Sequence, residues 1–426
     1  MKLVILSLFI IISICWCKKG FGPGEQDWDY VEVRKGAHMF WWLYYTTSNA
    51  ETPESKPLII WLQGGPGASS TGIGNFEELG PLDTNLNPRN HTWVKDYNVV
   101  FIDNPVGTGF SYVESDSLLT TNNTQIANDL IECLRSIYKK LPKFEGTPLY
   151  IAGESYGGKM AIEFAQILDE EIKQGNIKSN LKGVTLIDSW ISPIDSVLTW
   201  APYLLQTGMI DIEGYNRIEK QARKCKDLLD AGLYSEASNQ WELTEDEIDA
   251  VTNSIDFYNI LIKMEVEEQE RNKSKLLDTL ESDKLNSLMN NDVKKALNLT
   301  SNVTWSEDSD AVFDALNEDF MKPVVQIVEE VLNTTSIRVQ VVSGVLDLIV
   351  DTPGTYQWVK DMHFKDKEIF FNATRYPVTV NNYIEAYYMR YNTFSLYWVL
   401  RSGHMVPADN PNAMAKILEN LTFFID

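Results

Sequence analysis

The pentapeptide Gly153-Glu154-Ser155-Tyr156-Gly157 follows a short apolar run at residues 148–152 and precedes a helical pattern. It has the form G-x-S-x-G between a strand and a helix, which holds a serine on a tight turn with its hydroxyl exposed at the carboxyl edge of a sheet. The apolar residues that carry the helical spacing are Met160, Phe164, Ile167, Leu168 and Ile172. The stretch therefore predicts a nucleophile at Ser155. A surface turn rich in small residues is the alternative, and partner residues elsewhere in the chain have to decide between the two.

The strands that would flank this turn are short, continuous apolar runs. They lie at residues 57–62, 98–102, 149–152, 183–187 and 337–342, separated by loops and helical segments. Such runs are typical of strands buried on both faces by helices. Residues 30–33 and 39–45, around Lys35-Gly36, predict an amino-terminal hairpin, and residues 413–421 predict a final helix. The expected fold class is α/β, with a mixed, mostly parallel sheet flanked by helices.

The stretch between residues 193 and 302 reads as one helix after another, with charge clusters and no clear strand. We predict that it is a helical cap inserted over the carboxyl edge of the sheet, where the serine would lie. The remaining core would then consist of residues 18–192 and 303–426. A decorative insertion or a flexible excursion is the alternative interpretation.

Residues 1–17 combine a charged start with an apolar stretch, a pattern typical of a secretory signal peptide. The alternative is a membrane anchor, but the stretch is shorter than the roughly 20 residues that span a bilayer. We therefore expect a secreted or lysosomal protein. Removal of the leader would leave Cys133 and Cys225 as the cysteines of the mature chain, either joined in a disulfide or present as separate buried thiols.

Asn-x-Ser/Thr sequons are candidate glycosylation sites in an exported chain. They stand at Asn90, Asn122, Asn272, Asn298, Asn302, Asn333, Asn372 and Asn420.

The charge balance is strongly acidic, with 60 acidic and 37 basic residues among 426 and a formal net charge of −23. This argues against nucleic acid or an anionic membrane surface as a partner. It is compatible with an acidic compartment, where carboxylates are partly protonated and repel each other less. No histidine and cysteine spacing typical of zinc occurs, so we expect no metal and no cofactor.

A serine nucleophile needs a histidine to take its proton and a carboxylate to orient that histidine. The chain order of this strand-turn-helix class is serine, acid, histidine, which leaves His363 and His404. We favour His404, which follows a strand-like run, over His363, whose charged surroundings are typical of a surface. Asp347 and Asp351 follow the strand at residues 337–342; Asp347 is the first choice because it lies nearer the strand end, but spacing leaves both open. A turn-capping role for Asp347 is also open.

An oxyanion hole requires backbone N–H groups close to the nucleophile. Gln63-Gly64-Gly65-Pro66-Gly67 follows the strand that ends at Leu62, and its glycines permit a close approach of the main chain. One glycine amide, together with the amide of Tyr156, would form the hole. The alternative, a phosphate loop, lacks the required lysine followed by serine or threonine.

Taken together, these residues resemble the serine carboxypeptidase family over nearly the whole mature chain. The matching blocks are WLQGGPGASS at residues 61–70, DNPVGTGFSY at 103–112, GESYGG at 153–158 and GHMVP at 403–407. Residues 188–200 and 319–324 resemble one particular branch of that family.

The resemblance implies an α/β-hydrolase fold with a helical cap. It implies a catalytic triad of Ser155, Asp347 and His404, and an oxyanion hole formed by the amides of Gly65 and Tyr156. The residues that it assigns to the substrate's terminal carboxylate are Gln63, Gly64, Glu78 and Glu154. Gln63 is longer than the asparagine usual in the family, Glu77 is the fallback for Glu78, and Ala68 stands where many relatives have cysteine.

The function implied is the hydrolysis of carboxy-terminal residues from peptides or proteins through an acyl-enzyme, at acidic pH, and a homodimer is left open. An esterase or acyltransferase, or a non-catalytic binding protein on the same fold, is the alternative. The glutamates supply a physical reason for acidic pH. Two carboxylates that face a third cannot all be ionised at hydrogen-bonding distance, so Glu78 and Glu154 are expected to share a proton.

Overall fold

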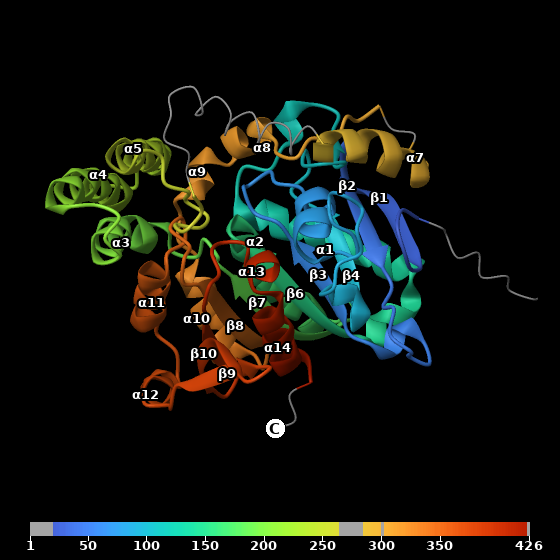
Figure 1. Ribbon diagram of the computed structural model, residues 1–426. Coiled ribbons are helices and arrows are strands. Elements are labelled where there is room, and N and C mark those ends of the chain that lie inside the picture. The colour runs from blue at the N-terminus through green and yellow to red at the C-terminus, as the bar shows by residue number, and fades with distance from the viewer. Residues whose placement is uncertain (1–19, 264–283, 300–301, 424–426) are drawn as a thin grey trace, which may run out of the picture.

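The computed structural model describes residues 20–263, 284–299 and 302–423 (Figure 1). The predicted signal peptide at residues 1–17 and the sequon at Asn272 lie outside these ranges. Among the described residues, no helix combines the length and the apolar character needed to cross a membrane.

A single twisted sheet runs through the described part of the chain, in the strand order β1-β2-β4-β3-β6-β7-β8-β11-β10-β9, with β5 paired to β2. The strands are β1 (Gln26–Arg34), β2 (Ala37–Tyr44), β3 (Leu58–Leu62), β4 (Asn98–Asp103), β5 (Tyr112–Val113), β6 (Pro148–Glu154), β7 (Asn180–Ile187), β8 (Arg338–Gly344), β9 (Tyr376–Val380), β10 (Tyr383–Tyr391) and β11 (Phe394–Val399). The central strands from β4 to β11 pair in parallel, and antiparallel strands close both edges. The predicted mixed sheet and amino-terminal hairpin are confirmed.

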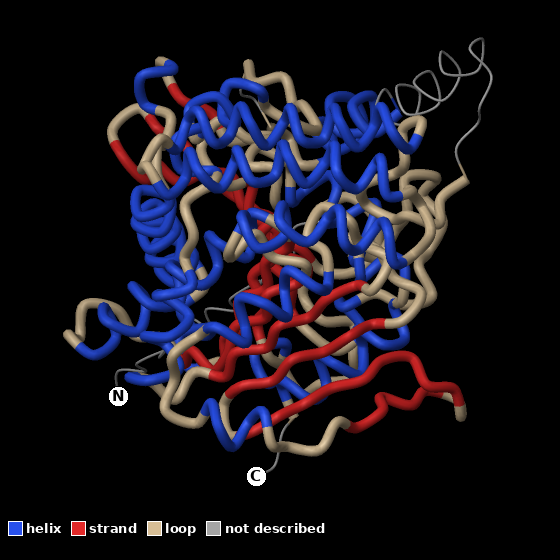
Figure 2. The backbone as a smooth tube through the Cα atoms, turned by 90° about the vertical axis from the view of Figure 1, so that its left-hand side faces the viewer, coloured by secondary structure: helices blue, strands red, loops and turns tan. Residues whose placement is uncertain are grey.

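Helices cover both faces of the sheet (Figure 2). The α-helices are α1 (Asn123–Lys140), α2 (Tyr156–Lys173), α3 (Pro193–Gln206), α4 (Ile212–Asp230), α5 (Tyr234–Thr252), α7 (Lys294–Ala296), α8 (Asp310–Ala315), α9 (Asn317–Phe320), α10 (Val325–Thr334), α11 (Thr352–Asp361), α12 (Lys367–Phe371), α13 (Val406–Asp409) and α14 (Pro411–Thr422). The longest of the other helical turns is a π-helix, η2 (Ser70–Leu79), and a second one, η6 (Leu288–Val293), leads into α7.

Strand β3 shows why its sequence is apolar throughout. Ile60 belongs to the core cluster shared with α1 and α2, whereas Ile59 and Trp61 belong to the cluster shared with η2 and α14. Because successive side chains of a strand point to opposite faces, a strand covered on both faces must be apolar at every position.

The stretch predicted as a helical cap divides into separate groups (Figure 1). Helices α3, α4 and α5 pack on one another at one side of the sheet. Residues 284–299, which include η6 and α7, lie beside the amino-terminal hairpin, where the indole N–H of Trp28 donates to the carbonyl of Leu297 at 2.9 Å. The division into a core and a cap at residues 193–302 stays a prediction.

Cys133 on α1 and Cys225 on α4 are both buried, free thiols. The Cys225 thiol donates to the carbonyl of Ala237 at 3.3 Å. Of the two interpretations of these cysteines, separate buried thiols is the one observed.

The turn between β6 and α2 has no room for added atoms. A Cβ at Gly157 would lie 2.2 Å from the carbonyl oxygen of Leu62, and one at Gly153 would lie 2.2 Å from the carbonyl oxygen of Gly157. The two glycines of G-x-S-x-G are therefore required by packing, since they let α2 begin directly against β3.

We predict that Gly157→Ala lowers the free energy of unfolding by about 1–3 kcal/mol or more. The new methyl group would overlap main-chain atoms, which cannot rotate away as the end of a flexible side chain could. Gly146→Ala is the matched control, since a Cβ at Gly146 meets no atom within 4 Å. Urea unfolding of the two variants checks this expectation. Equal stability of both would contradict the packing argument.

Candidate active site

Ser155 occupies a strained backbone conformation, with φ of 58° and ψ of −128°, directly between β6 and α2. Its N–H donates to the carbonyl oxygens of Ile187 at 3.0 Å and Asp188 at 3.1 Å, and its own carbonyl accepts from the N–H of Trp190 at 2.9 Å. A left-handed conformation costs a non-glycine residue about 1–3 kcal/mol and persists only where the surroundings impose it, as they do at functional turns. The predicted serine turn is therefore present.

Asp347 and His404 are brought into direct contact. Asp347 lies in the turn after β8, and its Oδ2 is 2.8 Å from Nδ1 of His404; both residues are buried. The Asp347 Oδ1 accepts from the N–H of Val350 at 3.2 Å. Burial raises the pKa of Asp347, and the neighbouring His404 opposes that rise. The main chain of His404 is also held in place, because its backbone N–H donates to the carbonyl of Tyr258 at 2.7 Å.

The alternative partners lie elsewhere. Asp351 is the N-cap of α11, where it accepts from the N–H of Gly354 at 3.3 Å and from the hydroxyl of Thr199 at 2.8 Å. His363 is a surface residue with 88% of its side chain exposed, 3.5 Å from Glu329. Contact with a histidine thus distinguishes Asp347 from Asp351, and burial beside a carboxylate distinguishes His404 from His363.

The predicted oxyanion loop lies against the serine. A Cβ at Gly64 would be 2.6 Å from the Cβ and 3.1 Å from the Oγ of Ser155, so only glycine permits this approach. Gly65 follows with φ of 97°. Tyr156 is the first residue of α2, so its N–H has no acceptor within the helix and lies at the positive end of the helix dipole.

Gln63 joins the two predicted glutamates in one buried cluster. Its Nε2 donates to Oε1 of Glu78 and to Oε1 of Glu154, both at 2.9 Å. Its Oε1 accepts from the indole N–H of Trp61 at 2.7 Å, which determines the orientation of the amide. Glu154 ends β6 beside Ser155, and Glu78 comes from η2.

The two glutamates of this cluster have pKa values above the ordinary range of a carboxylic acid. Burial raises the pKa of Glu78 to about 7, and a hydrogen bond from Glu154 and one from Gln63 oppose a larger rise. Burial and the nearby Glu78 raise the pKa of Glu154 well above its usual value. No amide or hydroxyl of the described residues donates to the Oε2 atom of either glutamate. The raised pKa values favour a proton shared by the pair, and the Oε2 atom of each glutamate is buried without a hydrogen-bond partner among the described residues.

A cavity of about 480 Å³ opens beside Ser155. Its lining residues are Gly65, Pro66, Ser155, Trp190, Trp241, Glu245, Phe257, Tyr258, Asp308, Ser309, Asp310, Phe313, Phe320 and Ile349. The ring of Tyr258 also packs edge-on against His404, at 5.0 Å between centroids. The cavity thus connects the serine turn with the histidine side of the site.

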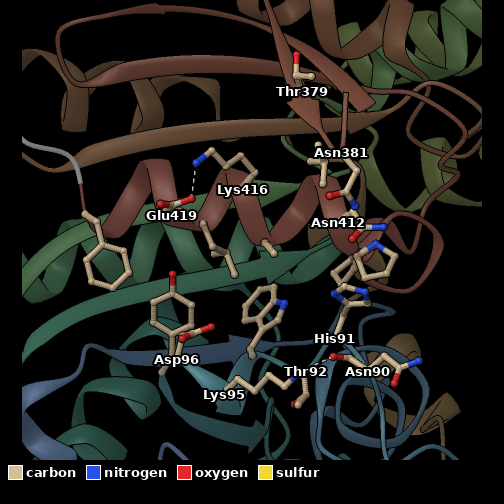
Figure 3. A pocket seen from close by; sticks show the side chains of 18 residues that line it. Asn90, His91, Thr92, Lys95, Asp96, Thr379, Asn381, Asn412, Lys416 and Glu419 are labelled. Carbon is tan, nitrogen blue, oxygen red and sulfur yellow. Dashed lines mark hydrogen bonds and ion pairs between the residues drawn. The ribbon is translucent and has the colours of Figure 1, made fainter. Parts of the chain in front are cut away.

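A second cavity, of about 620 Å³, lies between residues 90–97 and α14 (Figure 3). Asn90, His91, Asn412 and Lys416 are among its lining residues, and none of the predicted catalytic residues lines it. The chemistry therefore belongs to the smaller cavity.

Two buried groups near the site were not predicted from the sequence. Asp188 accepts from the N–H of Gly344 through both carboxylate oxygens, at 2.9 and 3.0 Å, and so ties the serine turn to the turn that carries Asp347. Burial and the nearby Asp347 raise the pKa of Asp188 well above its usual range. The one feature of the sequence that could have indicated a role for Asp188 is its position directly after strand β7.

The second group holds Tyr156, the first residue of α2, in place. The Lys159 ammonium lies 2.7 Å from Oδ2 of Asp319, and the Tyr156 hydroxyl donates to the same oxygen at 2.8 Å. All three side chains are buried. They come from segments about 160 residues apart, and no local pattern in the sequence relates them.

The sequons differ in their accessibility. Asn90, Asn298, Asn302, Asn333 and Asn372 are exposed. Asn122 and Asn420 are half-buried, and Asn122 caps α1 by accepting from the N–H of Gln125 at 3.0 Å. A glycan on Asn122 would compete with that cap. Glycosylation of any of these sites stays a prediction.

Comparison with known proteins identifies the family. Residues 19–423 match the serine carboxypeptidase family model. The chain is 40% identical to the retinoid-inducible serine carboxypeptidase of Mus musculus over 416 residues, covering 94% of this chain and 92% of that protein. It is 36% identical to the serine carboxypeptidase-like 51 protein of Arabidopsis thaliana over 457 residues, covering 99% of each. The branch that residues 188–200 and 319–324 resemble is the retinoid-inducible one.

Among solved structures, the fold matches Kex1(Δ)p, a prohormone-processing carboxypeptidase from Saccharomyces cerevisiae, with a TM-score of 0.81 and 21% identity over 95% of this chain and 92% of that one. This likeness confirms the predicted α/β-hydrolase fold. The chain therefore belongs to the serine carboxypeptidase family and is a hydrolase of that class.

Proposed function

We propose that this serine carboxypeptidase releases carboxy-terminal residues from peptides and proteins through an acyl-enzyme on Ser155. The observation that carries the proposal is the 2.8 Å contact between His404 and Asp347, beside the cavity in which Ser155 lies. The family and the printed names of the relatives support the same reaction.

The proposed reaction begins when His404 takes the Ser155 proton as Oγ attacks the carbonyl carbon of the last peptide bond. Asp347 holds the histidine with its Nδ1–H toward the carboxylate, which leaves the other ring nitrogen to act as the base. The amides of Gly65 and Tyr156 stabilise the negative oxygen that forms. His404 then protonates the departing amine, which frees the last residue, and activates the water that hydrolyses the ester.

The exopeptidase character would come from the cluster of Gln63, Glu78 and Glu154, with the Gly64 amide beside it. The protonated pair can donate to the terminal carboxylate of a substrate, which an ionised pair would repel. A longer peptide without a free carboxylate at this position would lose these hydrogen bonds and gain nothing in return. The proposed partners are therefore the C-termini of peptides or proteins.

The compartment that we propose is secretory or lysosomal. The leader-like pattern of residues 1–17, the exposed sequons and the proton-dependent glutamate pair all support it. A net charge of −23 argues against nucleic acid and anionic membrane surfaces as partners. A homodimer stays a prediction.

The direct test of this function is digestion of a peptide library at mildly acidic pH with product masses followed over time. We expect the stepwise loss of single residues from the carboxyl end, and none of it with Ser155→Ala. Cleavage inside peptides, or hydrolysis of esters alone, would replace the proposal with another hydrolase activity.

We predict that Asp347→Asn lowers kcat by about 10⁴-fold, because the amide favours the wrong histidine tautomer. Asp351→Asn is the matched control. Asparagine keeps the shape of this side chain and the oxygen that accepts from Gly354 and Thr199, and burial raises the pKa of Asp351 well above its usual range. We expect kcat to stay nearly unchanged in Asp351→Asn. Steady-state kinetics on one peptide checks both variants, and an equal loss in both would contradict the choice of Asp347.

We predict that KM for free peptides is constant at acidic pH and rises above the Glu78 pKa of about 7, approaching tenfold per pH unit. The sign follows from the raised pKa: the proton needed to bind the substrate carboxylate is present below pH 7 and is lost as the pH increases. Substrates with an amidated C-terminus should show no such rise. Comparing the KM profiles of the free and amidated forms cancels any pH dependence that the two substrates share.

The same profiles decide which glutamate is involved. Glu78→Gln keeps a hydrogen-bond donor at every pH, so the rise in KM for free peptides should disappear. Glu77→Gln is the matched control and should retain the rise. A flat profile in Glu77→Gln with an unchanged one in Glu78→Gln would move the assignment to Glu77.

A further inference from the structure

One wall of the cavity beside Ser155 is made of aromatic rings in mutual contact. Phe320 lies at its centre, with ring centroids 4.7 Å from Trp241, 5.2 Å from Phe313 and 5.4 Å from Trp190. The indole N–H of Trp190 donates to the carbonyl of Phe320 at 3.1 Å, which fixes the two rings relative to each other. Phe257, Tyr258 and Ile349 line the same cavity. Such a wall can bury a long aliphatic stem and attract a cation to its ring faces.

The same cavity is lined by acidic side chains. Glu245 from α5 and Asp308 and Asp310 from the start of α8 line it. No lysine, arginine or histidine is among its lining residues in the described part of the chain. The charged groups that act on Glu245 are the carboxylates of Asp249, Glu242 and Asp246, and those that act on Asp308 are Glu307 and Asp310.

Two of these carboxyl groups have a pKa above the usual range. Burial and the surrounding carboxylates raise the pKa of Glu245 to about 8 and that of Asp308 to about 6. A positive group in the cavity would lower both values again, because it would stabilise the ionised forms. A cation bound in the cavity would therefore pair with these carboxyl groups and favour their ionised forms.

The position of the cavity indicates which substrate residue it holds. The cluster of Gln63, Glu78 and Glu154, which we assign to the terminal carboxylate, does not line it. The last residue of a substrate has to extend from Ser155 toward that cluster. The cavity is then left for the other side of the scissile bond, where the side chain of the penultimate residue lies.

We propose that this cavity is a specificity pocket that selects lysine or arginine as the penultimate residue of the substrate. The aliphatic stem lies against the aromatic wall, and the cationic head reaches Asp308, Asp310 and Glu245. This inference rests on the proposed function and adds a substrate class to it. Attraction by ring faces and by partly exposed carboxylates together is expected to favour the cation by roughly 5- to 30-fold.

The experiment compares two N-acylated dipeptides with the same terminal leucine and either lysine or norleucine in the penultimate position. Norleucine has nearly the same stem as lysine but no ammonium group, so the ratio of their kcat/KM values isolates the charge. At pH 6.5, above the Asp308 pKa of about 6, we expect a ratio of about 10 in favour of lysine. The ratio should fall as salt is added, because the carboxylates on the rim are exposed to screening.

Variants locate the effect. Asp308→Asn combined with Asp310→Asn should bring the ratio close to 1 by lowering kcat/KM for lysine far more than kcat/KM for norleucine. Asp314→Asn is the matched control, since Asp314 is an exposed residue of the same short helix α8 that does not line the cavity. Its ratio should equal that of the unmodified protein.

Two results would overturn the inference alone: a ratio of 1 or less in the unmodified protein, or an equal fall of the ratio in Asp314→Asn. Both leave the proposed function intact, because the norleucine substrate is still cleaved at its last peptide bond. Failure to cleave either substrate, with Ser155 present, would overturn the proposed function and this inference with it.

Discussion

The site depends on how closely the turn around Ser155 packs against the strand and loop beside it. Gly157 lies so close to the carbonyl of Leu62 that a Cβ would not fit, and the same holds for Gly64 beside the side chain of Ser155. This contact places the serine, the oxyanion loop and the carboxyl end of β3 within a few ångströms of one another. The strained backbone of Ser155 is the consequence, and the hydrogen bonds from its N–H to the end of β7 hold it there.

Around that turn, buried carboxyl groups differ in how their charge is accommodated. Asp347 is paired with a histidine, which suits an ionised group in a dry site. Glu154 and Glu78 face each other, so a proton has to stay between them. Burial and the neighbouring Asp347 raise the pKa of Asp188, whereas the N–H of Gly344, which donates to both of its carboxylate oxygens, opposes that rise. One small region thus combines a carboxyl group paired with a histidine and carboxyl groups whose pKa is raised by burial and by neighbouring carboxyl groups.

Much of this arrangement could be predicted from the sequence. Strand β3 and strand β6 are continuous apolar runs. The glycines around Ser155 are part of the motif, and the structure shows that a Cβ at either position would overlap main-chain atoms. The choice of Asp347 over Asp351 could not be made, because both follow the same strand and only the three-dimensional turn brings one of them to His404. The link between Lys159 and Asp319 joins distant segments and has no local periodicity. The residues that line the cavity could not be predicted either. Trp241 and Phe313 come from helices whose packing is not specified by a local sequence pattern.

The central claim is that Ser155 becomes covalently acylated by the part of the substrate that precedes its last residue. It is tested most directly by mixing the enzyme with an ester substrate, stopping the reaction in acid within the first turnovers and measuring the mass of the protein and of its peptides. The account predicts an acyl adduct on the peptide that contains Ser155, lost on further incubation and absent from Ser155→Ala. Turnover with no adduct, or with an adduct on another residue, would contradict it.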